Sequence, residues 1–330
     1  MNSFGRIFRI SIFGESHGEG IGVVIDGCPP GIPFPLEDLT TDLSRRKSGA
    51  RGTTPRIEDD NPEILSGVYN GKTTGSPLTI FFKNKNTRSG DYESLKNIPR
   101  PGHADFVAFK KFKGFADPRG GGHFSGRLTL AIVAAGCIAK KILPHDVLFQ
   151  SEILEIGGSK DYESILNEAI EEGESLGGIV EVKVSNLPCG LGEPFFDSFE
   201  SLLSHLVFSV PAVKAIEFGS GFKSATMKGS IHNDPIISGD GKTLSNNSGG
   251  INGGITNGND LLFRVAIKPT ASIAKSQKSL NLKTGQLEEF TIEGRHDSAI
   301  VLRTPVIFEA CAAIVAADMY LIYKSYNTER

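Results

Sequence analysis

Short apolar runs closed by turn residues predict a chain rich in β-strands. The expected strands cover residues 6–13, 22–25, 64–69, 78–82, 179–184, 215–218 and 261–267. Runs of about four to eight apolar or alternating residues, bounded by glycine, proline, asparagine or serine, are typical of strands in a sheet.

Two predicted helices are apolar on almost every side. Segment 128–143 (LTLAIVAAGCIAKKIL) ends before Pro144, and segment 305–323 (PVIFEACAAIVAADMYLIY) begins with a proline, which suits the first turn of a helix. A helix without a polar face lies inside a protein. We therefore predict an α+β fold, in which a central helical layer is covered by sheets, and a single domain over residues 1–330.

Two further helices are expected. Segment 36–46 follows Pro35 and ends with Arg45 and Arg46, as the helix dipole favours. Segment 162–174 is acidic on one side, which is typical of a surface helix.

Composition excludes several classes of protein. Lysine and arginine number 35 against 38 for aspartate and glutamate, a net charge of −3, so the broad basic surface of a nucleic-acid binder is not expected. No apolar run reaches the roughly 20 residues that cross a bilayer, and the N-terminal sequence lacks the features of a secretory signal. The cysteines are far apart and are predicted to be reduced thiols: Cys28, Cys137, Cys189 and Cys311. We therefore expect a cytoplasmic protein with neither membrane nor nucleic acid as a partner.

Glycine is enriched, with 39 of 330 residues, and it is clustered. The first cluster, residues 118–127 (PRGGGHFSGR), leads into the apolar helix predicted at 128–143. Backbone N–H groups at a helix start bind anions, and Arg119 and Arg127 add charge suited to phosphate or carboxylate. The alternative is a glycine turn with surface arginines. The sequence does not match the phosphate-binding loop GxxxxGK[ST].

A second glycine cluster covers residues 248–258 and precedes a strand that ends in KPTAS at 268–272. Its hydroxyl and amide side chains, near a lysine, are suited to a polar cofactor. A long hairpin loop is the alternative, and the dinucleotide motif GxGxxG is not matched.

Three of the seven histidines lie in glycine- or arginine-rich loops: His17 in GESHG, His103 in RPGHAD and His296 in GRHD. Histidine exchanges protons near neutral pH, so these loops indicate acid–base chemistry on an anionic substrate. No HxH or HxxxH pair exists, and no metal site is expected. A Ser/His/Asp hydrolase is disfavoured because GxSxG is absent. His145, His205 and His232 have no such setting and are interpreted as structural.

Several motifs, taken together, resemble the chorismate synthase family. They are GESHG at 14–18, RPGHAD at 100–105, DPRGGG at 117–122, GLGEP at 190–194, GGINGG at 249–254, KPTAS at 268–272 and GRHD at 294–297. They occur in order over nearly the whole chain, from residue 6 to about residue 323.

The resemblance implies a reaction, a cofactor and an assembly. Members of the family convert 5-enolpyruvylshikimate 3-phosphate into chorismate and phosphate, the last step of the shikimate pathway. This anti-1,4-elimination requires reduced FMN (FMNH2) without net redox change. The family fold is a β-α-β sandwich, with helices between two antiparallel sheets, and the assembly is a homotetramer. NADPH as an indirect reductant, and an external flavin reductase as a partner, are further expectations.

The resemblance also assigns roles to residues. His17 is similar to the acid that protonates the leaving phosphate, His103 to the histidine that neutralises anionic reduced flavin, and Asp297 to the carboxylate that assists proton removal. FMN contacts are implied for Ser125, Pro211, Ala212, Gly253, Lys268, Pro269, Thr270, Ala271, Ser272 and Arg295. Arg46 and Arg51 match arginines that contact NADP or an anion, and Arg45, Arg119, Arg127 and Arg303 are expected to bind substrate phosphate and carboxylates.

One loop departs from the family. Its usual sequence is GGGRSSARET, whereas this chain has His123, Phe124 and Leu128 in place of arginine, serine and glutamate, and retains Ser125 and Arg127. The change affects the expected FMN and phosphate contacts of the loop. It also motivates an alternative to a lyase, a protein that binds flavin or anions without catalysis. A simple phosphatase is a third interpretation.

Overall fold

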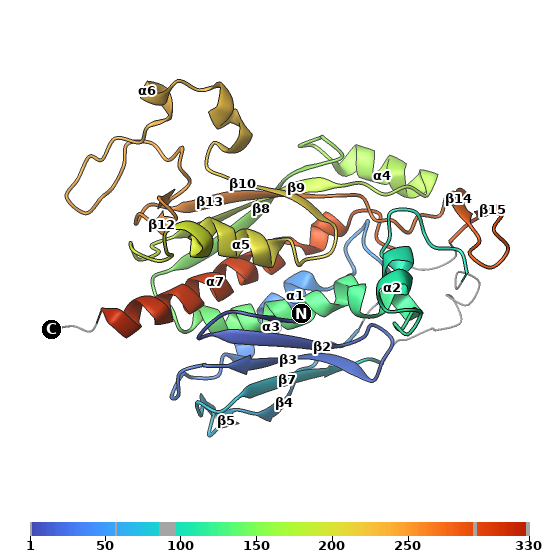
Figure 1. Ribbon diagram of the computed structural model, residues 1–330, viewed down its shortest axis with the longest axis horizontal. Helices are drawn as coiled ribbons and strands as arrows, with labels where there is room; N and C mark the ends of the chain where they lie inside the picture. The colour runs from blue at the N-terminus through green and yellow to red at the C-terminus, as the bar shows by residue number, and fades with distance from the viewer. Residues whose placement is uncertain (1, 57, 86–96, 293–295, 328–330) are drawn as a thin grey trace.

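Two antiparallel sheets enclose a layer of helices in the computed structural model, which describes residues 2–56, 58–85, 97–292 and 296–327. Figure 1 shows α7, α3 and α1 between the sheets, with β2, β3, β7 and β4 on one side and β8, β9, β10 and β13 on the other. The predicted α+β architecture with a central helical layer is confirmed.

The first sheet has the order β1-β2-β3-β7-β4. Its strands are β1 (Ser3–Phe4), β2 (Arg9–Gly14), β3 (Gly20–Asp26), β7 (Leu78–Lys83) and β4 (Glu63–Ser66). The inward residues of β3 and β7 are fully buried aliphatic or aromatic side chains, such as Val23 and Ile80, which pair in register. This face therefore packs against the helices.

The second sheet has the order β10-β13-β9-β8. Its strands are β10 (Val213–Phe218), β13 (Leu261–Ile267), β9 (Gly178–Ser185) and β8 (Leu148–Ile156). In β13, buried and half-buried residues alternate over the whole strand, as expected for a sheet with one face on the core. Strand β8 was not among the predicted strands, because its sequence LFQSEILEI mixes polar and apolar residues.

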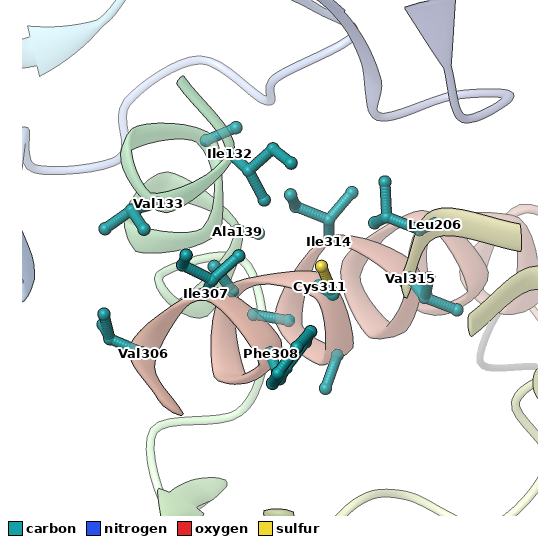
Figure 2. Close-up of a cluster of buried hydrophobic side chains, with 14 of the residues drawn as sticks. Ile132, Val133, Ala139, Leu206, Val306, Ile307, Phe308, Cys311, Ile314 and Val315 are labelled. Carbon is teal, nitrogen blue, oxygen red and sulfur yellow. The ribbon is translucent and has the colours of Figure 1, made fainter. Parts of the chain in front are cut away.

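The helical layer contains α1 (Leu36–Arg46), α3 (Thr129–Lys140) and α7 (Pro305–Tyr326). Helices α3 and α7 cross closely, because Gly136 faces Ala310: a Cβ added to Gly136 would lie 2.3 Å from the Ala310 Cβ. Figure 2 shows aliphatic side chains of both helices, such as Ile132 and Ile314, in the shared core. By length and composition α7 is able to cross a membrane, but 78% of its apolar window is buried inside the protein, as in a core helix.

Helix α7 carries two buried carboxylates that tie the layers together. Asp318 accepts hydrogen bonds from the backbone N–H groups of Arg6, Ile7 and Phe8, at 2.9, 2.7 and 2.9 Å. Burial raises the pKa of Asp318, and these three donors oppose that effect. Glu309 accepts a bidentate hydrogen bond from Arg45 of α1, at 2.8 and 2.6 Å.

The remaining elements lie around this sandwich. They are β5 (Val68–Tyr69), β6 (Lys72–Thr73), α2 (Asp105–Lys111), α4 (Glu163–Glu172), α5 (Phe199–Val207), α6 (Gly229–His232), β11 (Ile251–Asn252), β12 (Ile255–Thr256), β14 (Gln277–Leu280) and β15 (Leu287–Phe290). Helices α2 and α5 were not predicted. The segment between β10 and β11, residues 219–250, projects from the fold with α6 near its tip, and we call it the arm (Figure 1).

Candidate functional site

A cleft of about 720 Å³ lies where the loops of both sheets meet the ends of the central helices. Its walls come from seven stretches of chain, from Asn2 near the N-terminus to Ile307 in α7. Most of the predicted site residues line it: Arg46, His103, Ser125, Arg127, Pro211, Ala212, Lys268, Pro269, Thr270, Ala271, Ser272, Asp297 and Arg303. Stretches far apart in sequence therefore meet in one cavity.

Two buried arginines share one carboxylate at the wall of this cleft. Arg127 Nη1 lies 2.9 Å from Asp60 Oδ1, and Arg46 Nη2 lies 3.4 Å from Asp60 Oδ2. Burial, together with the positive charge of Arg303 and Arg127, lowers the pKa of Arg46 to about 9. One carboxylate neutralises one of the two guanidinium charges, so a positive charge is left over.

Each of these two arginines has an unused donor. Arg46 Nε and Arg127 Nη2 are buried and have no hydrogen-bond partner among the residues that the structure describes. A buried donor without a partner costs about 1–3 kcal/mol, so both atoms favour an anionic ligand in the cleft.

The glycine loop 120–122 brings two imidazoles close together. Its three glycines all have positive φ, at +59°, +83° and +53°. A Cβ added to Gly120 would lie 2.4 Å from His17 Cδ2, and one added to Gly121 would lie 3.4 Å from His103 Cε1. The N–H of Ser16 donates to the Gly122 carbonyl at 3.1 Å. The buried ring of His17 therefore lies against Gly120, which lines the cleft, and the ring of His103 lies against the next residue along.

His103 belongs to a network of charged groups. Its Nδ1 lies 2.6 Å from Asp105 Oδ1, at the start of α2. Arg100 donates to both oxygens of Asp105, at 2.7 and 2.8 Å, and to Ser272 Oγ at 3.1 Å. Burial alone would raise the pKa of Asp105, but the hydrogen bonds from Arg100 and His103 hold it well below its ordinary value. Asp105 is therefore ionised at neutral pH.

Asp297 is held at another wall of the cleft. Its Oδ1 accepts from the N–H of Thr54 at 2.9 Å, and Arg303 Nη1 lies 3.2 Å from its Oδ2. Arg303 also donates through Nε to the carbonyl of Arg46 at 3.0 Å. The two arginines and the carboxylate are thereby fixed relative to one another.

The loop KPTAS meets the loop RPGH across the cleft. Lys268 Nζ donates to the Gly102 carbonyl at 3.0 Å, and burial and the neighbouring Lys214 lower the pKa of Lys268. Thr270 Oγ1 is buried and finds no hydrogen-bond partner in the described part of the chain. This wall offers an ammonium and hydroxyl groups to a ligand.

Five predicted residues do not line the cleft, as far as the described residues show. His17 is one of them, although its buried ring lies against Gly120, which does line it. Arg45 is bound to Glu309, and Arg119 is exposed and paired with Asp117 at 2.8 Å. Arg51 is exposed outside the cleft, and Gly253 is exposed at the β11–β12 turn.

Arg295 was predicted to contact FMN, and His123 is a departure from the family sequence. Arg295 lies outside the described residues, but its neighbour His296 lines the cleft. His123, the main departure from the family, also lines the cleft, and its Nδ1 lies 2.8 Å from the Gly14 carbonyl.

Several residues of the site were missed by the sequence analysis. Arg100 and Asp105 stand inside the motif RPGHAD, and their charge at five-residue spacing was the available signal. Asp60 gives no such signal, because only the fold brings it between two arginines. No group of three or more histidine, cysteine, aspartate or glutamate side chains suited to a metal ion occurs among the described residues.

Comparison with known proteins identifies relatives over the whole chain. Residues 8–321 match the family model described as chorismate synthase. The chain is 59% identical over 327 residues to a chorismate synthase of Chitinophaga pinensis, covering 99% of this chain and 98% of that protein. It is 45% identical over 351 residues to a chorismate synthase of Dehalococcoides mccartyi, covering 97% and 96%. A solved structure titled "Crystal Structure of Chorismate Synthase" matches with a TM-score of 0.74 at 29% identity, covering 97% of this chain and 93% of that one.

Proposed function

The chain belongs to the chorismate synthase family and is a lyase, and we propose that it eliminates phosphate from 5-enolpyruvylshikimate 3-phosphate to form chorismate. The proposal includes reduced FMN as cofactor, no net redox change, and a place as the last step of the shikimate pathway. The observation that carries it is the cleft itself, whose walls hold the His103 imidazole and buried guanidinium donors, with the His17 imidazole against Gly120 of the same glycine loop.

The residues of the cleft fit FMN. The Lys268 ammonium and the Ser125 and Thr270 hydroxyls offer hydrogen bonds, and Pro211 and Ala212 offer apolar contact to a planar ring. When bound, reduced FMN would lend electron density to the substrate as phosphate departs and recover it as the proton is removed, so that no net redox change results. Arg46 is buried and Arg51 is exposed outside the cleft, so the two do not form a joint dinucleotide site. We therefore assign NADPH to an external flavin reductase.

The chain's own residues hold the substrate and move protons. Arg46 and Arg127 bind the phosphate through their unused donors, and the fixed positive charge stabilises the leaving group without water reorganisation. The C–O bond breaks with its electron pair on phosphate, and His17 donates a proton to that phosphate. The C–H bond breaks, its electron pair forms a new ring double bond while the existing ring double bond shifts towards the carbon that loses phosphate, and Asp297 assists removal of the proton. His103 places a proton-exchanging nitrogen at the cofactor side of the cleft.

We also propose that the protein is a cytoplasmic homotetramer. Five large apolar side chains of the arm are exposed: Phe222, Ile231, Ile236, Ile237 and Leu244. Exposed apolar side chains gathered on one projecting segment favour a protein–protein contact there. Light scattering coupled to gel filtration measures the assembly, and a mass of one chain contradicts the tetramer.

An anaerobic assay with photoreduced FMN and the enolpyruvyl substrate tests the activity. We expect chorismate absorbance and phosphate release in equal amounts, and only with reduced flavin. Phosphate without chorismate, and without a need for flavin, would indicate a phosphatase. FMN binding without either product would indicate a non-catalytic binding protein.

Histidine variants then test the roles within the site. We expect His17→Ala and His103→Ala each to lose about 10²–10⁴-fold in turnover while still binding FMN, the usual contribution of an acid or base. His145→Ala is the matched control, since His145 is exposed and outside the cleft. Full activity in both test variants contradicts their assigned roles.

A further inference from the structure

Asp105 is a half-buried carboxylate that the roles proposed above do not use. It contacts Arg100 and His103 but does not itself line the cleft. Building on the proposed function, we propose that Asp105 is a positioning residue that fixes a proton on His103 Nδ1 and leaves His103 Nε2 to exchange a proton with the ligand in the cleft.

The short contact between His103 and Asp105 determines which nitrogen carries the proton. The distance from Nδ1 to Oδ1 is 2.6 Å. An ionised carboxylate only accepts hydrogen bonds, so an Nδ1 without a proton would place two lone pairs against each other at this distance. Nδ1 therefore carries the proton and donates it to Asp105. In the neutral ring the proton-free nitrogen is then Nε2.

Arg100 is close enough to His103 to suggest the opposite tautomer. Its Nη2 lies 3.1 Å from His103 Nδ1, and an arginine donor there would require a proton-free Nδ1. The same Nη2 lies nearer to Asp105 Oδ1, at 2.8 Å, and Nε donates to Oδ2 at 2.7 Å. A charge-assisted hydrogen bond to a carboxylate is stronger than one to a neutral ring, so Arg100 donates to Asp105 rather than to His103 Nδ1. Arg100 thus orients the carboxylate that orients His103.

Nε2 of His103 lies beside the glycine loop. His103 lines the cleft, as does Gly120, and a Cβ on the next residue, Gly121, would lie 3.5 Å from His103 Nε2. The charged groups around the ring are Arg100 and Asp105 on its own segment, with Lys268 beyond the Gly102 carbonyl. Asp105 is the carboxylate that contacts the ring directly, at Nδ1.

The variant Asp105→Asn should reverse the tautomer of His103, while asparagine keeps almost the same shape as aspartate. The asparagine amide is able to donate to Nδ1, which places the ring proton on Nε2 and removes the nitrogen that accepts a proton in the cleft. A comparable change in a Ser-His-Asp triad lowers kcat by about 10⁴-fold through the wrong tautomer. We expect turnover to fall at least about 100-fold with KM changed much less.

Histidine ¹⁵N NMR tests the tautomer without any need for activity. Chain labelled on histidine is measured at a pH where the ring is neutral, and the His103 signals are assigned by their loss in His103→Ala. We expect a protonated Nδ1 and a proton-free Nε2 in the wild type, and the reverse in Asp105→Asn. Asp26→Asn is the control, because Asp26 forms an exposed ion pair with Arg9 away from the cleft.

Three results test whether Asp105 sets the tautomer of His103. A wild-type His103 protonated on Nε2 overturns the proposal, even if Asp105→Asn does not fold. An unchanged tautomer in a folded Asp105→Asn also overturns it. A double variant, His103→Ala with Asp105→Asn, should be no slower than His103→Ala alone if Asp105 acts through His103. Failure of the wild type to form chorismate contradicts the proposed function instead, and leaves the NMR result standing.

Discussion

Substitution of Gly120 by alanine probes whether the glycine loop sets the position of His17. Gly120 has φ of +59°, and an alanine Cβ there would lie 2.4 Å from His17 Cδ2 and 2.5 Å from Nε2. An ordinary contact needs about 1 Å more, so the ring has to move by that amount. The left-handed backbone costs an alanine about 1–2 kcal/mol, and overpacking adds about 1–3 kcal/mol.

Gly121→Ala separates displacement of the histidine from backbone strain. Gly121 also has positive φ, at +83°, but its Cβ would lie 3.4 Å from His103, an ordinary contact. Both variants therefore carry similar backbone strain, and only Gly120→Ala moves a ring. A misplacement of about 1 Å at a catalytic group costs on the order of 100-fold in rate.

The assay is kcat/KM for chorismate formation under anaerobic conditions with excess reduced FMN, together with the thermal midpoint of each variant. We expect Gly120→Ala to be about 100-fold slower than Gly121→Ala and less stable. Gly31→Ala reports strain far from the cleft, because its φ is +84° and its Cβ would meet nothing within 4 Å. Equal rates for the two loop variants would refute the reasoning.

Three further predictions concern the arginines, the core and pH. Arg127→Lys keeps the charge but loses the fork that holds Asp60 and the ligand, so kcat/KM should fall about 100-fold or more; a value near wild type contradicts the phosphate role. Asp318→Ala leaves the N–H groups of Arg6, Ile7 and Phe8 without their acceptor. It should lower the free energy of unfolding by about 3 kcal/mol, as measured by urea titration, with Asp26→Asn as the near-neutral control. Burial alone would raise the pKa of Asp234 in the arm, but hydrogen bonds from Ser245, Asn247 and Ser248 lower it to about 2. Because that pKa is below the unfolded value of about 3.9, the stabilisation is present above pH 4 and is lost as pH falls towards 2. The stability difference between wild type and Asp234→Asn should vanish over that range.

Periodicity and turn residues were sufficient for most of the fold. The predicted helix 36–46 and strand 261–267 have the observed bounds of α1 and β13, and the apolar sequences of α3 and α7 correctly placed both helices inside. Strand β8 was missed because its pattern of polar and apolar residues is mixed, and its contacts with β9 and α7 stabilise it. Helix α5 was missed although its buried residues, Phe199, Leu203, Leu206 and Val207, recur at helical spacing.

The site was predictable only as a set of loops. Motifs identified His103, Arg127 and Asp297, and the fold brings them to one cleft. Sequence could not distinguish Arg127, whose Nη2 is buried beside the cleft, from Arg45, which is bound to Glu309. Both are arginines near a helix end, and only the carboxylates that the fold places beside each one decide its partner.

The cleft takes walls from Asn2 at one end of the chain and from Ile307 at the other. During synthesis on the ribosome, the first sheet can form long before α7 emerges, because domains begin to fold from the N-terminus. The cleft nevertheless stays incomplete until the wall that contains His296 and Ile307 has been made. A chain that stops before His296 therefore lacks one wall of the cleft, even though the first sheet is already able to form.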